Sequence, residues 1–128
     1  MGFYRRFKAN KYGNTKINGY DSKAEARRGA ELEALAAAGK ITGLQKQVSF
    51  VLIPAQREPE TIGKRGGRIK GKLIERAVVY VADFVYLNQD GETIVEDVKG
   101  YKGGGAYELF KIKRKLMLYV HGIRVKET

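Results

Sequence analysis

The sequence predicts an α/β fold with a central mixed sheet flanked by helices, in the order α-β-β-β-α-β. Two segments carry apolar side chains at helical spacing. Between them lie three runs rich in valine, isoleucine and aromatic residues, which are typical of strands. The chain has 128 residues and no internal repeat, so we expect one domain that spans residues 1–128.

The first helix is expected to run from Ser22 to Ala38. Ser22 is a favourable N-cap, and Gly39 is a favourable residue just beyond the last turn. Glu25 lies on the apolar stripe of this helix, and two interpretations are open. It can complete a capping box with Ser22, or it can point a carboxylate toward an active site. The expected apolar stripe consists of Leu32, Leu35 and Ala36.

Three strands are expected at residues 47–53, 73–87 and 92–99. Residues 55–72, rich in glycine and charge, predict a long, basic, flexible loop that could contain a small hairpin. A second helix is expected over residues 106–119 and should end at Gly122, with a short final strand at residues 123–125. The buried stripe expected for this helix is Leu109, Ile112, Leu116 and Tyr119.

A strong positive charge predicts a polyanionic partner. The chain contains 25 lysine and arginine residues against 14 acidic residues, which gives a pI near 9.9. The cations gather in a basic N-terminal arm at residues 1–20, in the loop at residues 55–72 and on the second helix. The competing explanation for such charge is solubility. The candidate nucleic-acid-binding residues are Arg5, Arg6, Lys64, Arg65, Arg68, Lys70, Lys111 and Lys115.

Composition also excludes several classes of site. The absence of cysteine excludes zinc sites built from thiolates, and a single histidine, His121, argues against histidine-rich metal sites and serine-histidine-aspartate triads. The N-terminus lacks the uninterrupted apolar run that would predict a signal peptide. No stretch approaches the roughly 20 apolar residues that a membrane span needs. We therefore expect a cytoplasmic protein.

The hairpin over residues 78–99 carries the acidic residues that suggest catalysis. Because strand side chains alternate between faces, Asp97 and Lys99 share one face. The place of Asp83 depends on the turn. A two-residue loop, Asp90-Gly91, would put Asp83 opposite Val98. A three-residue loop that also includes Gln89 would put Asp83 opposite Asp97, with Cβ atoms about 5 Å apart. Both loops are plausible from the sequence.

Two adjacent carboxylates repel each other unless one is protonated or a cation lies between them. Oxygen ligands of this kind suit Mg²⁺ or Mn²⁺. A neighbouring lysine, Lys99, would help to neutralise the charge that develops when a phosphodiester bond is hydrolysed. The alternative is a surface hairpin with a cross-strand ion pair of little energetic value.

The segment Ala82-Asp83, followed after thirteen residues by Asp97-Val98-Lys99-Gly100, resembles the PD-(D/E)XK nuclease superfamily. The resemblance covers about residues 20–125. It implies a restriction-endonuclease-like core, and more narrowly it points to a phage- and prophage-borne family similar to Holliday-junction resolvases. The chain departs from the superfamily pattern at Ala82, where the name of the superfamily implies proline.

The resemblance implies that Glu25, Asp83, Asp97 and Lys99 are catalytic. Glu25, Asp83, Asp97 and the main-chain carbonyl of Val98 would bind the metal. Gln47 resembles a glutamine that some members keep near the site, although a polar residue at a strand start explains it more simply.

The expected activity is that of a divalent-metal-dependent endonuclease that cuts DNA, especially branched DNA such as a Holliday junction, and leaves a 5′-phosphate. The resemblance also implies a homodimer and a phage or prophage protein acting in a bacterial host. Two alternatives stay open at this point. One is a non-enzymatic nucleic-acid-binding module, and the other is a degenerate nuclease fold used in phage assembly or recombination.

Overall fold

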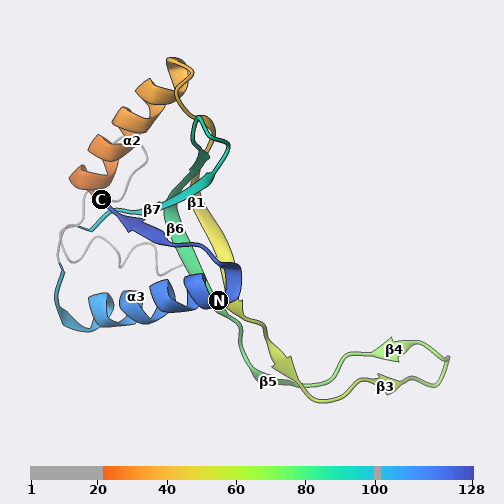
Figure 1. Cartoon of the computed structure of the whole chain (residues 1–128). Helices are drawn as coiled ribbons and strands as arrows, with labels where there is room; N and C mark the ends of the chain where they lie inside the picture. Colours follow the sequence, from red (N-terminus) through yellow and green to blue (C-terminus); the bar gives the residue numbers. More distant parts are fainter. Residues whose placement is uncertain (1–21, 100–101) are drawn as a thin grey trace.

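The computed structural model describes residues 22–99 and 102–128, and it confirms the predicted α/β class and the order of the main elements. A four-stranded mixed sheet with strand order β1-β6-β7-β8 forms the centre. Two helices, α2 and α3, lie beside different parts of this sheet (Figure 1). The first three strands pair antiparallel, whereas β8 pairs parallel with β7 after the crossover through α3. The strands are β1 (Thr42–Ile53), β6 (Val78–Leu87), β7 (Thr93–Asp97) and β8 (Val125–Glu127).

Helix α2 (Lys23–Ala37) has the ends that the sequence predicts. The Ser22 hydroxyl accepts a hydrogen bond from the Glu25 amide at 3.1 Å, and Gly39 has a φ of +75°, which a residue with a side chain rarely adopts. Leu32 is fully buried, as expected. Leu35 is 37% exposed, so its predicted place in the core is wrong. The buried face of α2 instead runs along Glu25, Gly29 and Leu32.

The β6–β7 hairpin has the three-residue loop. The Asn88 amide donates to the Glu92 carbonyl at 3.0 Å, and Gly91 has a φ of +79°. The Asn88 side chain stabilises this turn, because its carbonyl accepts from the amides of Asp90 and Glu92. Pairing then runs from Leu87 with Thr93 to Phe84 with Glu96. Continued by one residue, this register places Asp83 opposite Asp97.

Helix α3 (Gly104–Leu116) continues into one π-helical turn, η2 (Met117–His121), and ends at Gly122 as predicted. Of its predicted stripe, only Leu116 packs against the core, and the other three residues are exposed. Leu109, Ile112 and Tyr119 are 53%, 56% and 87% exposed. The buried residues are Phe110 and Met117. The helix turns this face to the sheet because the Phe110 ring packs against the ring of Tyr80 in β6.

Residues 55–72, expected to be a flexible loop, belong to a narrow arm that projects away from the sheet (Figure 1). The small hairpin that the sequence allowed is present, and it extends further than expected. The predicted strand over residues 73–87 is therefore divided, since its first part belongs to the arm. The arm contains two short antiparallel pairs, β2 (Gln56–Arg57) with β5 (Leu73–Glu75) and β3 (Thr61–Ile62) with β4 (Arg68–Ile69).

Two apolar clusters attach the helices. Leu32 of α2 packs in one cluster with Ile41, Phe84 and Tyr86. Phe110 of α3 and Met117 of η2 pack in the other. Within residues 22–99 and 102–128, no helix is long and apolar enough to cross a membrane. The second cluster also contains Leu52, Tyr80, Ala82, Val95 and Val125.

Candidate active site

Gln47 connects two of the predicted site residues. Its side-chain nitrogen donates to Oε2 of Glu25 at 2.9 Å and to Oδ1 of Asp83 at 3.2 Å. Gln47 also has a φ of +54°, the left-handed conformation that non-glycine residues seldom adopt, in the middle of strand β1. The structure therefore brings α2, β1 and β6 together through one amide group.

Asp83 lies next to the backbone that follows β7. Its Oδ2 accepts a hydrogen bond from the Val98 amide at 2.7 Å. Partial burial raises the pKa of the Asp83 carboxyl, and repulsion by Asp97 raises it further, although the Val98 amide, Gln47 and Lys99 act in the opposite direction. The two aspartates are thus electrostatic neighbours, as the three-residue loop requires.

Asp97 is 6% exposed and is held from two sides. Its Oδ1 lies 3.0 Å from Nζ of Lys99, and its Oδ2 accepts a hydrogen bond from the Tyr80 hydroxyl at 2.6 Å. Burial raises the pKa of Tyr80, and the hydrogen bond to Asp97 raises it further, so this hydroxyl stays protonated as a donor. Lys99 also lies over the Phe110 ring, with Nζ 3.9 Å from its centroid.

Asp97 and Lys99 line a cleft of about 250 Å³ between β6 and α3. Tyr80 and Phe110 form part of its wall, and Lys113 of α3 adds a second lysine. A carboxylate and two ammonium groups therefore face a space in which an anionic group can be held. The other lining residues are Val79, Val81, Ala106 and Leu109.

The side chains available to a metal ion here are oxygen donors. In the part of the chain that the structure describes, no group of three or more histidine or acidic residues could hold a metal ion by itself. Mg²⁺ needs only one or two protein carboxylates, because water and substrate phosphate complete its shell. Asp83 and Asp97 meet that requirement, and a cation between them would offset the repulsion that raises the pKa of Asp83. These residues fit Mg²⁺ or Mn²⁺.

The remaining predicted site residues fall into three places. Glu25 is 7% exposed, its carboxylate accepts from Gln47, and its backbone amide donates to the Ser22 hydroxyl, which is one of the two hydrogen bonds of a capping box. Among the described residues it does not join Asp83 and Asp97 in a three-acid metal group. Val98 is half-buried, and its carbonyl stays only a predicted ligand. Arg5 and Arg6 lie outside the described residues.

The predicted basic residues that the structure describes form two groups instead of one rim. Lys64, Arg65, Arg68 and Lys70 lie on the arm, far along the chain from the α3 residues Lys111 and Lys115. Lys111 forms an ion pair with Glu108 at 3.0 Å. Figure 1 shows the arm pointing away from α3, so the two groups would contact different parts of a ligand.

Two contacts of the site were not predicted from the sequence, and Gln47 was expected near it only by resemblance. One is the hydrogen bond from Tyr80 to Asp97. The other is the pair between Arg28 of α2 and the fully buried Glu96 of β7, in which Nη2 and Oε2 are 2.7 Å apart. One signal was available: strand alternation puts Glu96 on the face opposite Asp97, and an acid buried on an apolar face needs a cationic partner.

Among known proteins, the chain matches a family model but no individual curated protein or solved structure. One family model matches residues 5–126. Because this match covers nearly the whole sequence, the chain belongs to the family described as "Protein of unknown function (DUF1064)".

Proposed function

We propose that this protein is a divalent-metal-dependent nuclease that hydrolyses phosphodiester bonds in DNA. One observation carries the proposal: the hairpin register places Asp83, Asp97 and Lys99 in a single cluster, with Glu25 attached to it through Gln47. A hairpin with an incidental surface ion pair would not need a buried aspartate held by both a tyrosine and a lysine.

Each side chain has a role that its contacts support. Asp83 and Asp97 would bind Mg²⁺ or Mn²⁺, and that ion would supply an activated water and polarise a phosphate oxygen. Lys99, held beside Asp97, would stabilise the negative charge that develops on the phosphate. The Tyr80 hydroxyl holds one oxygen of Asp97 in place. The Gln47 amide holds one oxygen of Asp83 and one oxygen of Glu25.

The arm supports DNA as the substrate. Residues 61–72 carry five lysine and arginine residues and no acidic residue. A two-stranded ribbon is narrow enough to enter the major groove of duplex DNA. The five cations are Lys64, Arg65, Arg68, Lys70 and Lys72.

The finer proposal is a resolvase-like nuclease that acts on branched DNA as a homodimer, in the cytoplasm of a bacterial host that carries the phage or prophage. Two symmetric cuts need two active sites. The exposed apolar residues of α3 and η2 that do not line the cleft, Ile112 and Leu118 among them, provide a surface that a second copy could cover. Light scattering of the purified protein measures the oligomeric state, and a monomer would contradict the dimer without affecting the chemistry.

The experiment for the activity is cleavage of labelled DNA with Mg²⁺ or Mn²⁺, compared across a four-way junction, a flap and a plain duplex. We expect Asp97→Asn and Lys99→Ala to lower the cleavage rate about a hundredfold or more. Asp90→Asn, which removes a carboxylate at the exposed end of the same hairpin, should cleave at the wild-type rate.

The competing function is a nucleic-acid-binding module without catalysis, which the arm alone would also support. Binding of the junction without any cuts, at an affinity that Asp97→Asn does not change, would favour that module. Faster cleavage of plain duplex than of the junction would keep the nuclease and remove the preference for branched DNA.

A further inference from the structure

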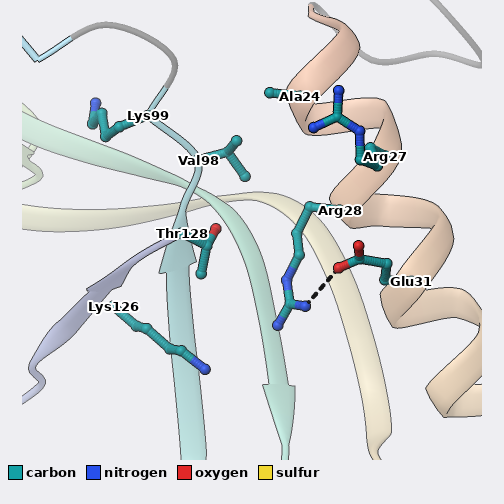
Figure 2. A pocket seen from close by; sticks show the side chains of 8 residues that line it. All are labelled: Ala24, Arg27, Arg28, Glu31, Val98, Lys99, Lys126 and Thr128. Atoms are coloured by element: carbon teal, nitrogen blue, oxygen red, sulfur yellow. Dashed lines mark hydrogen bonds and ion pairs between the residues drawn. The ribbon is translucent and has the colours of Figure 1, made fainter.

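A second cavity, of about 450 Å³, lies where the first turns of α2 face the ends of β7 and β8. Figure 2 shows the side chains that line it, from α2 on one side and from the strand ends on the other. Four of its eight lining residues are cationic and one is acidic. The lining residues are Ala24, Arg27, Arg28, Glu31, Val98, Lys99, Lys126 and Thr128.

Two of these cations are available to a ligand, whereas Arg28 is not. Its guanidinium donates to both carboxylate oxygens of the buried Glu96, at 2.8 and 2.7 Å, and to Glu31 at 2.9 Å. Within the described ranges, Arg27 and Lys126 form no ion pair, and both side chains are exposed. Lys99 is likewise paired, with Asp97. The free positive charge of the cavity therefore comes from Arg27 and Lys126, two cations with unused hydrogen-bond donors.

The cavity adjoins the candidate active site through consecutive residues. The Val98 side chain points toward α2 and into the cavity, whereas the Lys99 side chain points away from α2 (Figure 2). Lys99 reaches Asp97, and the Val98 amide is held by Asp83. A group bound in the cavity would thus lie beside the backbone that carries the catalytic lysine.

We propose that this cavity binds the phosphate backbone of the nucleic-acid strand, next to the bond that is cut, through Arg27 at one end and Lys126 at the other (Figure 2). The inference rests on the proposed function and specifies how the substrate strand is positioned. The planar guanidinium of Arg27 can donate two parallel hydrogen bonds to a phosphate, and Lys126 adds a point charge. The phosphate can be internal to the strand or can lie at its 5′ end.

The test is binding without cleavage. Affinity of the full chain for a fluorescent oligonucleotide is measured by anisotropy in EDTA, for wild type, Arg27→Ala/Lys126→Ala and the control Lys40→Ala. Lys40 is an exposed cation just beyond α2 that does not line the cavity. We expect the double variant to bind about tenfold more weakly. Its slope of log affinity against log salt should also fall by about two, as expected for two lost phosphate contacts.

Two further arms identify the occupant. Oligonucleotides with a 5′-phosphate or a 5′-hydroxyl distinguish a terminal phosphate from an internal one. If the site binds a terminal phosphate, wild type should bind the 5′-phosphate oligonucleotide more tightly, and the double variant should bind both with equal affinity. Titration of the wild-type protein with inorganic phosphate, followed by amide NMR, should shift the signals of Lys126 and Thr128.

The outcomes separate this inference from the nuclease proposal. If the double variant equals Lys40→Ala in affinity and salt dependence, the phosphate site is wrong, whatever the cleavage result. If binding depends on Arg27 and Lys126 but wild type never cuts, the site stands and the nuclease proposal fails.

Discussion

Gln47 is the residue at which backbone strain and the candidate site meet. A non-glycine residue with a φ of +54° in a strand costs of the order of 1–3 kcal/mol. What this conformation provides is a side-chain amide that contacts both Glu25 and Asp83. An amide that donates to two carboxylates partly offsets their repulsion, so the strain has a function in the site that we propose.

The strain at Gln47 gives the first prediction. Gln47→Gly and Gln47→Ala both remove the two hydrogen bonds, but only glycine adopts this φ without penalty. We expect Gln47→Gly to be more stable than Gln47→Ala by about 1 kcal/mol, measured by urea denaturation.

A position in the same strand with a negative φ provides the control for Gln47. At Gln45, alanine should be at least as stable as glycine, because glycine costs more conformational entropy there. Equal stabilities of the two Gln47 variants would show that the backbone at that position is not strained.

The proximity of the two aspartates gives the second prediction. Because burial and repulsion by Asp97 both raise the pKa of Asp83, removing the charge of Asp97 should lower it. Carbon-13 NMR of the aspartate carboxyl groups in Asp97→Asn measures this change. The control is Glu31→Gln, on the other side of the strand ends, which should leave the pKa of Asp83 unaltered. If the pKa of Asp83 also stays unaltered in Asp97→Asn, the basis for a shared metal site is removed.

At this scale, local chemistry was predictable and long-range contacts were not. The sequence allowed two loops for the hairpin. Asn88 and Gly91 decide between them by hydrogen bonds and a left-handed φ, neither of which shows in the strand pattern. The contacts of Tyr80 with Asp97 and of Arg28 with Glu96 depend on how separate elements are placed. Alternation within one strand indicates that Glu96 needs a cationic partner, but it could not identify Arg28 as that partner.

Among the elements, the arm depends on one glycine. The Cα of Gly71 lies so close to the opposite strand that an added Cβ would come within 1.8 Å of the Glu58 carbonyl oxygen. Two hydrogen bonds surround this approach: the Glu58 amide donates to Lys72, and the Arg57 guanidinium donates to the Gly71 carbonyl. A side chain at this position must therefore separate the two sides of the arm.

This close approach gives the third prediction. Gly71→Ala should distort the arm, displace the cations beyond it and weaken binding of duplex DNA by about tenfold, measured by anisotropy. The urea midpoint of the sheet domain should change little, because the arm lies outside both apolar clusters. Gly67→Ala is the matched control, since a Cβ there meets nothing within 4 Å. Unchanged binding by Gly71→Ala would exclude the arm from the proposed DNA interface.

Helix ends followed local rules, whereas helix faces did not. Ser22 and Gly39 bound α2 as capping preferences predict. Helix α3 carries apolar residues on more than one face, so spacing alone could not identify the buried one. The structure buries Phe110 because the sheet offers Tyr80 as a partner ring, and Leu109 and Ile112 stay exposed. A choice of this kind is made by tertiary packing.

At the scale of the whole molecule, ion pairs attach the two helices to the sheet. Helix α2 is attached to β7, and helix α3 is attached to β8, the strand that follows β7 after the crossover. Arg28 of α2 binds the buried Glu96 of β7, whose carboxylate also accepts from the Tyr86 hydroxyl. Arg114 of α3 binds Glu127 of β8, with Nη1 and Oε2 2.8 Å apart. The order of the elements was predictable from the chain, but these attachments, which hold α2 and its Glu25 over the site, were not.

The attachment of α2 makes stability depend on pH in a definite direction. Burial acts to raise the pKa of the Glu96 carboxyl, but hydrogen bonds from Arg28 and Tyr86 together hold it below its ordinary value. A carboxyl with a depressed pKa in the folded state stabilises the fold above its unfolded pKa of about 4.3, and this contribution is lost as the pH falls through the folded value. Wild type should therefore lose stability in acid from this group.

Arg28→Met should reverse that dependence for Glu96. Without the guanidinium, burial raises the pKa of Glu96, so the unpaired charge destabilises the fold at neutral pH and the penalty fades on acidification. We expect Arg28→Met to cost about 3 kcal/mol at pH 7, near the low end for a broken buried pair because Arg28 keeps some contact with solvent. The gap to wild type, measured by urea denaturation, should narrow as the pH falls through the raised pKa of Glu96 in the variant, above about 4.3, and should narrow further below that value as wild type loses its own contribution. Adding Glu96→Gln to Arg28→Met should recover part of the loss at pH 7, and a gap that stays constant with pH would show that Glu96 does not carry the charge that anchors α2.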